Sequence, residues 1–245
     1  MPAEASGEPL CVVTGSASGI GLALARRLLQ AGWRVAGLDR APCPEELEVA
    51  RYHHHRLQLD DQEAVAAWCV AQAACIGAQG LTGLVHCAGV VRAADATDFD
   101  AAQADHMWRL HVGSMATLCQ GLHPHLPAGR GRIVLVSSRA VLGRAGRSAY
   151  ASTKAAQIGL ARSLAAEFVS RGITVNVVAP GATDTPMLRD PQRGLPPRVD
   201  LPMGRLITAD EVAGSIAFFL GPDAGAITGQ TLYVCGGASL GTAAL

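Results

Sequence analysis

The sequence has no excess of charge, no long apolar run and no closely paired cysteines. Lysine plus arginine number 20 and aspartate plus glutamate number 20 among its 245 residues, so no broad basic surface for nucleic acid is expected. No apolar stretch approaches the roughly 18 residues that span a membrane, and the first ten residues do not read as a signal peptide. We therefore expect a cytoplasmic protein.

Seven cysteines are present, but no two of them form a Cys-x-x-Cys pair. Several lie within apolar runs, which favours reduced thiols in the core over disulfides or a metal site. Three consecutive histidines, at 53–55, are interpreted as the exposed start of a strand, and no metal is expected. The sequence contains no internal repeat or linker, so residues 1–245 are predicted to form a single domain.

Short runs of apolar and β-branched residues alternate along the chain with longer stretches of helical periodicity. This alternation is typical of βαβ units, which build a parallel sheet with helices on both faces. The pattern predicts a doubly wound α/β fold with a seven-stranded parallel sheet. The expected strands are Leu10 to Thr14, Arg34 to Leu38, His55 to Leu59, Gly83 to His86, Arg132 to Ser137, Ile173 to Val178 and Thr231 to Val234.

Five stretches show helical periodicity between these strands. The expected helices are Ile20 to Ala31, Gln62 to Ile76, Ala101 to His123, Ala149 to Ser170 and Ala209 to Leu220. Thr208 is the expected N-cap of the last helix. The segment from Pro186 to Arg205 fits neither pattern, because prolines and glycines interrupt any regular period, and we interpret it as a substrate lid.

A glycine-rich segment, Thr14-Gly15-Ser16-Ala17-Ser18-Gly19-Ile20-Gly21, follows the first expected strand and leads into the first helix. Glycines let the backbone approach a pyrophosphate, and the amides at the helix start attract its charge. The second strand leads to Asp39, whose carboxylate can bind both hydroxyls of an NAD ribose and would repel the 2′-phosphate of NADP. Arg40 could soften that repulsion, so NAD is favoured and NADP is the alternative. Together these features predict a Rossmann-type dinucleotide site.

Tyr150 and Lys154 lie four residues apart in an expected helix, so their side chains share one face. A nearby ammonium favours the phenolate, which lets a tyrosine exchange a proton with an alcohol or an alkoxide. A hydroxyl after the fifth apolar run, Ser138 or Ser137, can donate a hydrogen bond to the same substrate oxygen. The pattern indicates hydride transfer between a nicotinamide cofactor and a hydroxyl or carbonyl group.

With its TGSASGIG segment and the run from Tyr150 to Lys154, the chain resembles the classical short-chain dehydrogenase/reductase (SDR) family along nearly its whole length. The resemblance implies a nicotinamide cofactor and a homotetramer, with Tyr150, Lys154 and Ser138 as catalytic residues. It favours Ser138 over Ser137, although the following loop is one residue shorter than in many relatives. The expected cofactor-binding residues are Gly15, Ser16, Ser18, Gly19, Ile20, Gly21, Asp39, Arg40, Asp60, Ala88, Gly89, Tyr150, Lys154, Pro180, Gly181, Thr183 and Thr185.

Two segments depart from the family pattern. Where the family usually has an asparagine that helps to hold a water connecting the lysine to solvent, this chain has His111. Histidine titrates near neutrality and can bind a water or a carbonyl, so His111 is a candidate for a modified proton relay, with a packing residue as the alternative. The family's Asn-Asn-Ala-Gly motif is His86-Cys87-Ala88-Gly89 here, so other groups must replace the bonds of the asparagines.

Arginines concentrate in the lid and in the segments that follow the fourth and fifth strands. Ligands of open parallel sheets lie beyond the carboxyl ends of the strands, and guanidinium groups suit carboxylates. One hypothesis is therefore a substrate with an anionic group, bound by Arg92 and Arg139; solvated loop charge or subunit contact is the alternative. The whole set is Arg92, Arg139, Arg144, Arg147, Arg189 and Arg193.

Three functions are compatible with these residues. The first is an NAD-dependent oxidoreductase of secondary alcohols or ketones, of the polyol, cyclic diol or hydroxy acid type. The second is an NADPH-dependent 3-oxoacyl thioester reductase, although Ser18 stands where that class usually has an arginine and Asp39 opposes NADPH. The third is a non-catalytic dinucleotide sensor, against which the intact Ser138, Tyr150 and Lys154 argue.

Overall fold

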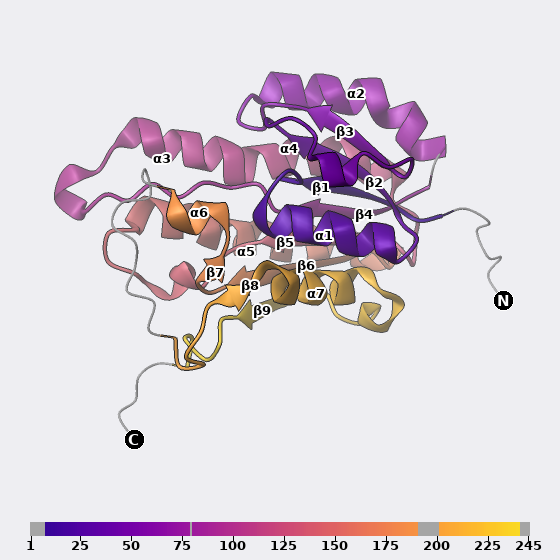
Figure 1. Cartoon of the computed structure of the whole chain (residues 1–245). Coiled ribbons are helices and arrows are strands. Elements are labelled where there is room, and N and C mark those ends of the chain that lie inside the picture. Colours follow the sequence, from indigo (N-terminus) through magenta and orange to yellow (C-terminus); the bar gives the residue numbers. More distant parts are fainter. Residues whose placement is uncertain (1–7, 79, 191–200, 241–245) are drawn as a thin grey trace.

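The computed structural model describes residues 8–78, 80–190 and 201–240, and their centre is a parallel sheet of seven strands in the order β3-β2-β1-β4-β5-β6-β9 (Figure 1). Every residue of β1, β5 and β6 is buried, as expected for inner strands that are covered on both faces. The predicted Rossmann-type, doubly wound fold is confirmed. The strands are β1 (Leu10–Thr14), β2 (Arg34–Asp39), β3 (Tyr52–Arg56), β4 (Leu81–His86), β5 (Arg132–Val136), β6 (Thr174–Pro180) and β9 (Thr231–Val234).

Helices cover both faces of the sheet and enclose two apolar cores (Figure 1). On one face α1 packs against α7, and on the other α2 packs against α4 beside α5. Thr208 caps α7 as predicted, and Glu211 completes a capping box. The helices are α1 (Gly19–Gln30), α2 (Gln62–Ala78), α3 (Ala101–Trp108), α4 (Ser114–Leu122), α5 (Ser148–Phe168), α6 (Pro186–Arg189) and α7 (Ala209–Leu220).

The third strand lies earlier in the chain than predicted, at Tyr52–Arg56 instead of His55 to Leu59. Tyr52 pairs with Val35 of β2, and its buried hydroxyl lies 2.9 Å from the hydroxyl of Ser16. This anchor sets the register of β3 and leaves residues 57–59 beyond the end of the strand, where they line a cavity.

The single long helix expected from Ala101 to His123 is divided by a π-helical turn at Arg109–Gly113. Side chains compensate for the disturbed backbone bonds there. Ser114 Oγ donates to the carbonyl of Leu110 at 2.6 Å, and Gln157 of α5 donates to the carbonyl of His111 at 2.9 Å. Such wide turns persist where side chains satisfy the carbonyls that the helix leaves open.

Two short strands, β7 (Thr183–Asp184) and β8 (Ile207–Thr208), pair in parallel just outside the two ends of the predicted lid. Residues 191–200 of that segment, Arg193 among them, lie outside the described residues. None of the described helices is both long and apolar enough to cross a membrane. No disulfide joins the seven cysteines, and no group of three potential metal ligands occurs in the part of the chain that the structure describes.

Candidate active site

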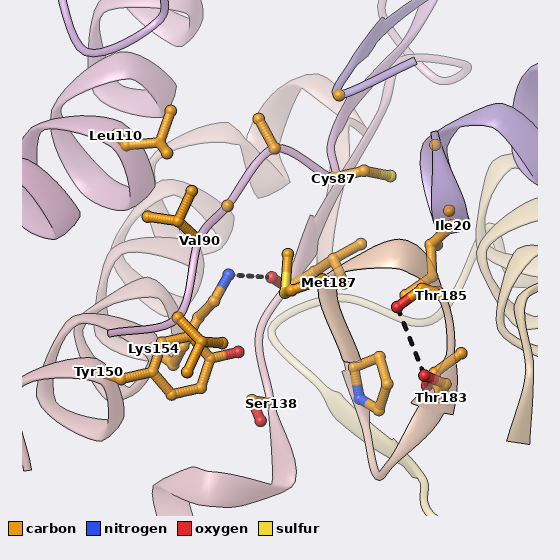
Figure 2. A pocket seen from close by; sticks show the side chains of 18 of the residues that line it. Ile20, Cys87, Val90, Leu110, Ser138, Tyr150, Lys154, Thr183, Thr185 and Met187 are labelled. Atoms are coloured by element: carbon orange, nitrogen blue, oxygen red, sulfur yellow. Dashed lines mark hydrogen bonds between the residues drawn. The ribbon is translucent and has the colours of Figure 1, made fainter. Parts of the chain in front are cut away.

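A cavity lies at the carboxyl ends of the strands, where the strand order reverses between β1 and β4. Open parallel sheets bind their ligands at this switch point. The glycine-rich segment after β1 lines it together with the segments that follow β2, β3, β4, β5 and β6. Figure 2 shows Ser138, Tyr150 and Lys154 on one side of the cavity and Ile20, Thr183 and Thr185 on the other.

Most of the site residues expected from the sequence line this cavity. They are Gly15, Ser18, Gly19, Ile20, Gly21, Asp39, Arg40, Asp60, Ala88, Gly89, Ser138, Arg139, Tyr150, Lys154, Pro180, Gly181, Thr183 and Thr185. Ser16, Arg92 and His111 do not. Ser16 turns its hydroxyl toward Tyr52, and His111 is fully buried. Arg92 lies beside a second hollow, with its Nη1 3.5 Å from a carboxylate oxygen of Asp190.

The glycines form a tight cradle at one end of the cavity. Gly15 has a φ of +67°, and a Cβ on it would lie 2.9 Å from the backbone of Ala88. A Cβ on Gly21 would overlap the carbonyl oxygen of Gly15. The side chain of Ser18, the N-cap residue of α1, makes no capping bond, which leaves the first amides of the helix available to an anion in the cavity. These residues fit the pyrophosphate of a dinucleotide.

Asp39 is held in place beside this cradle. One carboxylate oxygen accepts from the amide of Ala17 at 3.0 Å, and the other accepts from the amide of Ala41 at 2.9 Å. Two backbone donors therefore fix the carboxylate at the end of β2, where it still lines the cavity. The exposed side chain of Arg40 lies next to it. The arrangement offers an acceptor for hydroxyl groups at a fixed position.

Thr14 bonds to the end of β4 and to the segment that follows it. Its hydroxyl lies 2.9 Å from Nδ1 of His86 and accepts from the amide of Ala88 at 3.1 Å. Burial lowers the pKa of His86 to about 3, so the ring is neutral. Burial likewise raises the pKa of Cys87 to about 12, which keeps the thiol protonated. Thus both departures from the motif supply uncharged packing groups.

Lys154 lies one helical turn after Tyr150 on α5, and both side chains are buried. The ammonium donates to the carbonyl of Val136 at 2.8 Å and to Oε1 of Gln157 at 3.2 Å. Burial lowers the pKa of Lys154 to about 7, so the amine titrates near neutrality. Its nitrogen lies 5.9 Å from the centre of the Tyr150 ring, close enough for its charge to act on the phenol.

The two serines after β5 have different bonds. Ser137 is buried and donates its hydroxyl proton to the carbonyl of Lys154 at 2.7 Å. Ser138 accepts from the amide of Ala140 at 3.1 Å, so its own proton can be donated into the cavity that it lines. This difference favours Ser138 as the donor to a substrate oxygen.

His111 is placed behind the cavity wall. Its Nε2 accepts from the amide of Val90 at 3.0 Å, and its Nδ1 lies 2.8 Å from Oγ1 of Thr153. The hydroxyl of Thr153 donates to the carbonyl of Tyr150, so the ring proton of His111 sits on Nδ1 and is donated to Thr153. Burial, with the charge of Lys154, lowers the pKa of His111 well below its usual range. This geometry favours the packing alternative over the proton relay.

The side chain of Gln157 connects Lys154 with the backbone of His111. Its amide donates to the carbonyl of His111 at 2.9 Å, while its oxygen accepts from Lys154. Gln157 is fully buried, so this side chain bridges lysine and the π-helical turn without solvent. Sequence reasoning missed it. The available signal was its position three residues after Lys154 on the same helix face.

A family model described as Enoyl-(Acyl carrier protein) reductase matches residues 15–239. The chain belongs to the short-chain dehydrogenase/reductase family. As an SDR it is an oxidoreductase of alcohol- or ketone-type substrates that uses a nicotinamide dinucleotide. The glycine cradle, Tyr150 and Lys154 line the same cavity.

Known SDR proteins match over almost their whole length. The chain is 34% identical over 243 residues to the (2S)-[(R)-hydroxy(phenyl)methyl]succinyl-CoA dehydrogenase subunit BbsD of Thauera aromatica, covering 94% of this chain and 96% of the relative. It is 33% identical over 245 residues to the 3-oxoacyl-[acyl-carrier-protein] reductase FabG of Escherichia coli, covering 93% and 96%. The solved aldohexose dehydrogenase of Thermoplasma acidophilum superposes with a TM-score of 0.85 at 25% identity, covering 98% and 97%.

Proposed function

We propose that this SDR uses NAD to interconvert a secondary alcohol and its ketone, of the polyol, cyclic diol or hydroxy acid type. The observation that supports this most directly is that Tyr150, Lys154 and Ser138 share one cavity with the glycine cradle and Asp39. The cofactor, when bound, accepts or supplies the hydride through its nicotinamide. The chain itself handles the proton and the charge on the substrate oxygen.

Tyr150 is the proposed proton acceptor in oxidation and the proton donor in reduction. The positive charge of Lys154 beside it favours the phenolate, because opposite charges stabilise each other in a buried site. Ser138 donates a hydrogen bond to the same substrate oxygen and stabilises its negative charge. Tyr150 and Ser138 thus act on the substrate oxygen, and Lys154 acts on it through Tyr150.

Asp39 supports NAD over NADP. Its carboxylate is fixed by two amides and lines the cavity beside the glycine cradle. It can accept from ribose hydroxyls, whereas a 2′-phosphate would bring a second negative charge against it. The runner-up, an NADPH-dependent 3-oxoacyl thioester reductase, is favoured by the 33% identity to FabG and opposed by this carboxylate.

Turnover of the purified protein tests the proposal. We would measure kcat/KM with NAD and NADP on secondary alcohols and their ketones and on an acetoacetyl thioester. Tyr150→Phe should lose at least about 100-fold in turnover, because it removes the group that exchanges the proton. Tyr233→Phe, which deletes a hydroxyl outside the cavity, is the matched control. An NADPH-specific wild type that prefers the thioester would establish the runner-up, and cofactor binding without turnover of any substrate would establish the sensor.

The homotetramer that the resemblance implies stays a prediction. Exposed apolar side chains occur on α7 and β9, at Phe218 and Leu232, and Leu240 near the C-terminal end is 84% exposed. Light scattering of the purified protein measures the assembly directly. A monomer of 25.2 kDa would contradict it.

A further inference from the structure

Arg147 is a buried cation at the catalytic end of the cavity. It stands at the N-cap position of α5, three residues before Tyr150, and lines the cavity with it. The residue is 8% exposed, and Nη1 donates to the carbonyl of Gly146 at 3.2 Å. Burial lowers the pKa of Arg147, as does the neighbouring charge of Arg144, whereas the nearby phenol of Tyr150 raises it. Keeping a guanidinium in this place costs free energy unless something pairs with it.

The described residues do not supply that partner. No carboxylate among them lies within ion-pair distance of Arg147, Arg144 or Arg139. This holds even for Asp95, which lies on the segment next to Arg147. Arg92, in contrast, is already paired with Asp190. A guanidinium has five donors, and a backbone carbonyl satisfies few of them.

Charge is distributed unevenly around the cavity. Its acidic lining residues, Asp39 and Asp60, follow β2 and β3, whereas Arg139, Arg144 and Arg147 follow β5, three strands away from β2 in the sheet. Arg139 lies between Ser138 and Ala140 and donates to the carbonyl of Ala238 at 3.1 Å. The catalytic end therefore carries several arginines without a neutralising acid among the described residues.

We propose that Arg147, with Arg144 and Arg139 beside it, forms a subsite for an oxyanion that the substrate carries, a carboxylate or a sulfonate. The planar fork of a guanidinium matches two oxygens of such a group, and a bound anion would complete the pairing that residues 8–78, 80–190 and 201–240 do not provide. The inference rests on the proposed function and narrows its substrate class to acids bearing a hydroxyl or keto group. Arg92, expected from the sequence as a contact, is replaced by Arg147.

Binding of unreactive probes tests the subsite apart from turnover. Isothermal titration calorimetry of the NAD-loaded protein would compare acetate, cyclohexanecarboxylate and benzoate with their amides, and ethanesulfonate with ethanesulfonamide. We expect at least one acid to bind about 10-fold more tightly than its amide, as a charge-assisted bond in a buried site allows. The titration is then repeated without NAD. If the arginines instead bind the phosphates of the cofactor, the acid should bind only when NAD is absent. If they form a substrate site, the acid should also bind when NAD is present.

Variants test whether Arg147 causes the preference for an acid over its amide. Arg147→Gln should reduce this preference to within about twofold, and Arg147→Lys should keep part of it. Arg162→Gln, an exposed change on the same helix, should keep all of it. If Arg147→Gln does not fold, the double variant Arg139→Gln, Arg144→Gln, at less buried positions, replaces it, and the preference for the acid should fall there too. No preference for any acid, or a preference that survives these changes, overturns the proposal. Wild type that binds acids but transfers hydride with no substrate would refute the function and not the subsite.

Discussion

At the proposed cofactor end of the cavity close backbone packing sets the shape, whereas at the proposed catalytic end buried side chains bond to one another. The cradle needs glycines because a Cβ on Gly15 or Gly21 would meet backbone atoms, and Asp39 is held by two amides. Lys154 instead donates to Gln157 as well as to the carbonyl of Val136, and Gln157 donates to the carbonyl of His111. Changes at the cofactor end should act locally, while changes at the catalytic end should spread through the network.

The largest effect is expected from Lys154→Met, which removes the charge beside Tyr150 and should lower turnover by at least about 100-fold. It should also change how stability depends on pH. The folded pKa of Lys154 is about 7, below the 10.5 of an ordinary lysine, so between pH 7 and 10 the unfolded chain binds a proton that the folded protein lacks. Wild type should therefore gain stability relative to Lys154→Met as pH rises through that window.

Urea unfolding of both proteins at pH 6.5, 8 and 9.5 measures this difference, with Arg162→Met as an exposed control on the same helix. Well below pH 7 Lys154 is protonated in both states, so its contribution to the slope fades there. Parallel stability curves for wild type and Lys154→Met would show that Lys154 titrates at its ordinary pKa in the folded protein.

An intermediate effect is expected from Asp39→Asn at the cofactor end. The substitution keeps the shape of the side chain, gives up one of the two bonds from backbone amides and removes the charge that opposes a 2′-phosphate, so kcat/KM with NADP relative to NAD should rise by about 10-fold or more. Its pH profile should match that of wild type, since no bond joins Asp39 to Lys154. Asp223→Asn, an exposed change far from the cavity lining, is the control. An unchanged cofactor ratio would remove the reason for assigning NAD.

The smallest effect is expected from Gln157→Leu, yet it tests the network most directly. Without the oxygen of Gln157 the ammonium of Lys154 is less stable in its buried site, so the pH at which oxidation is half-maximal should move upward by up to about one unit. The KM for NAD should stay the same. Gln120→Leu on the exposed side of α4 is the control. If Gln157→Leu lowered thermal stability but left the pH profile of oxidation unchanged, Gln157 would contribute to packing only.

The glycine-rich end of the cavity could be predicted from the sequence, whereas the bonded network around Lys154 could not. The order of Gly15, Gly21 and Asp39 relative to the first two strands follows from local rules, because backbone geometry dictates those residue types. The bridge from Lys154 through Gln157 to His111 needs the packing of α5 against a π-helical turn, and the period of the sequence gives no sign of that turn. The ion pair between Arg92 and Asp190 likewise joins residues 98 positions apart.

Local periodicity also failed at the third strand. The run from His55 to Leu59 has an apolar pattern, but the register is set by Tyr52, whose hydroxyl reaches Ser16 across β2. Ser16, whose cofactor contact stays a prediction, thus also joins the first strand's loop to β3 through its hydroxyl. Only the three-dimensional arrangement distinguishes these roles, because both suit a small hydroxyl beside a glycine.

Lys154 is the chain's only lysine, the other 19 basic residues being arginine. With its pKa lowered to about 7, a large part of its amine is uncharged and nucleophilic at neutral pH. An acylating reagent small enough to enter the cavity therefore has one side-chain amine to modify anywhere in the protein. Acylation of the Lys154 side chain itself, measured apart from that of the α-amino group and the thiols, counts the accessible sites, and any ligand that fills the cavity can be scored by the protection it gives.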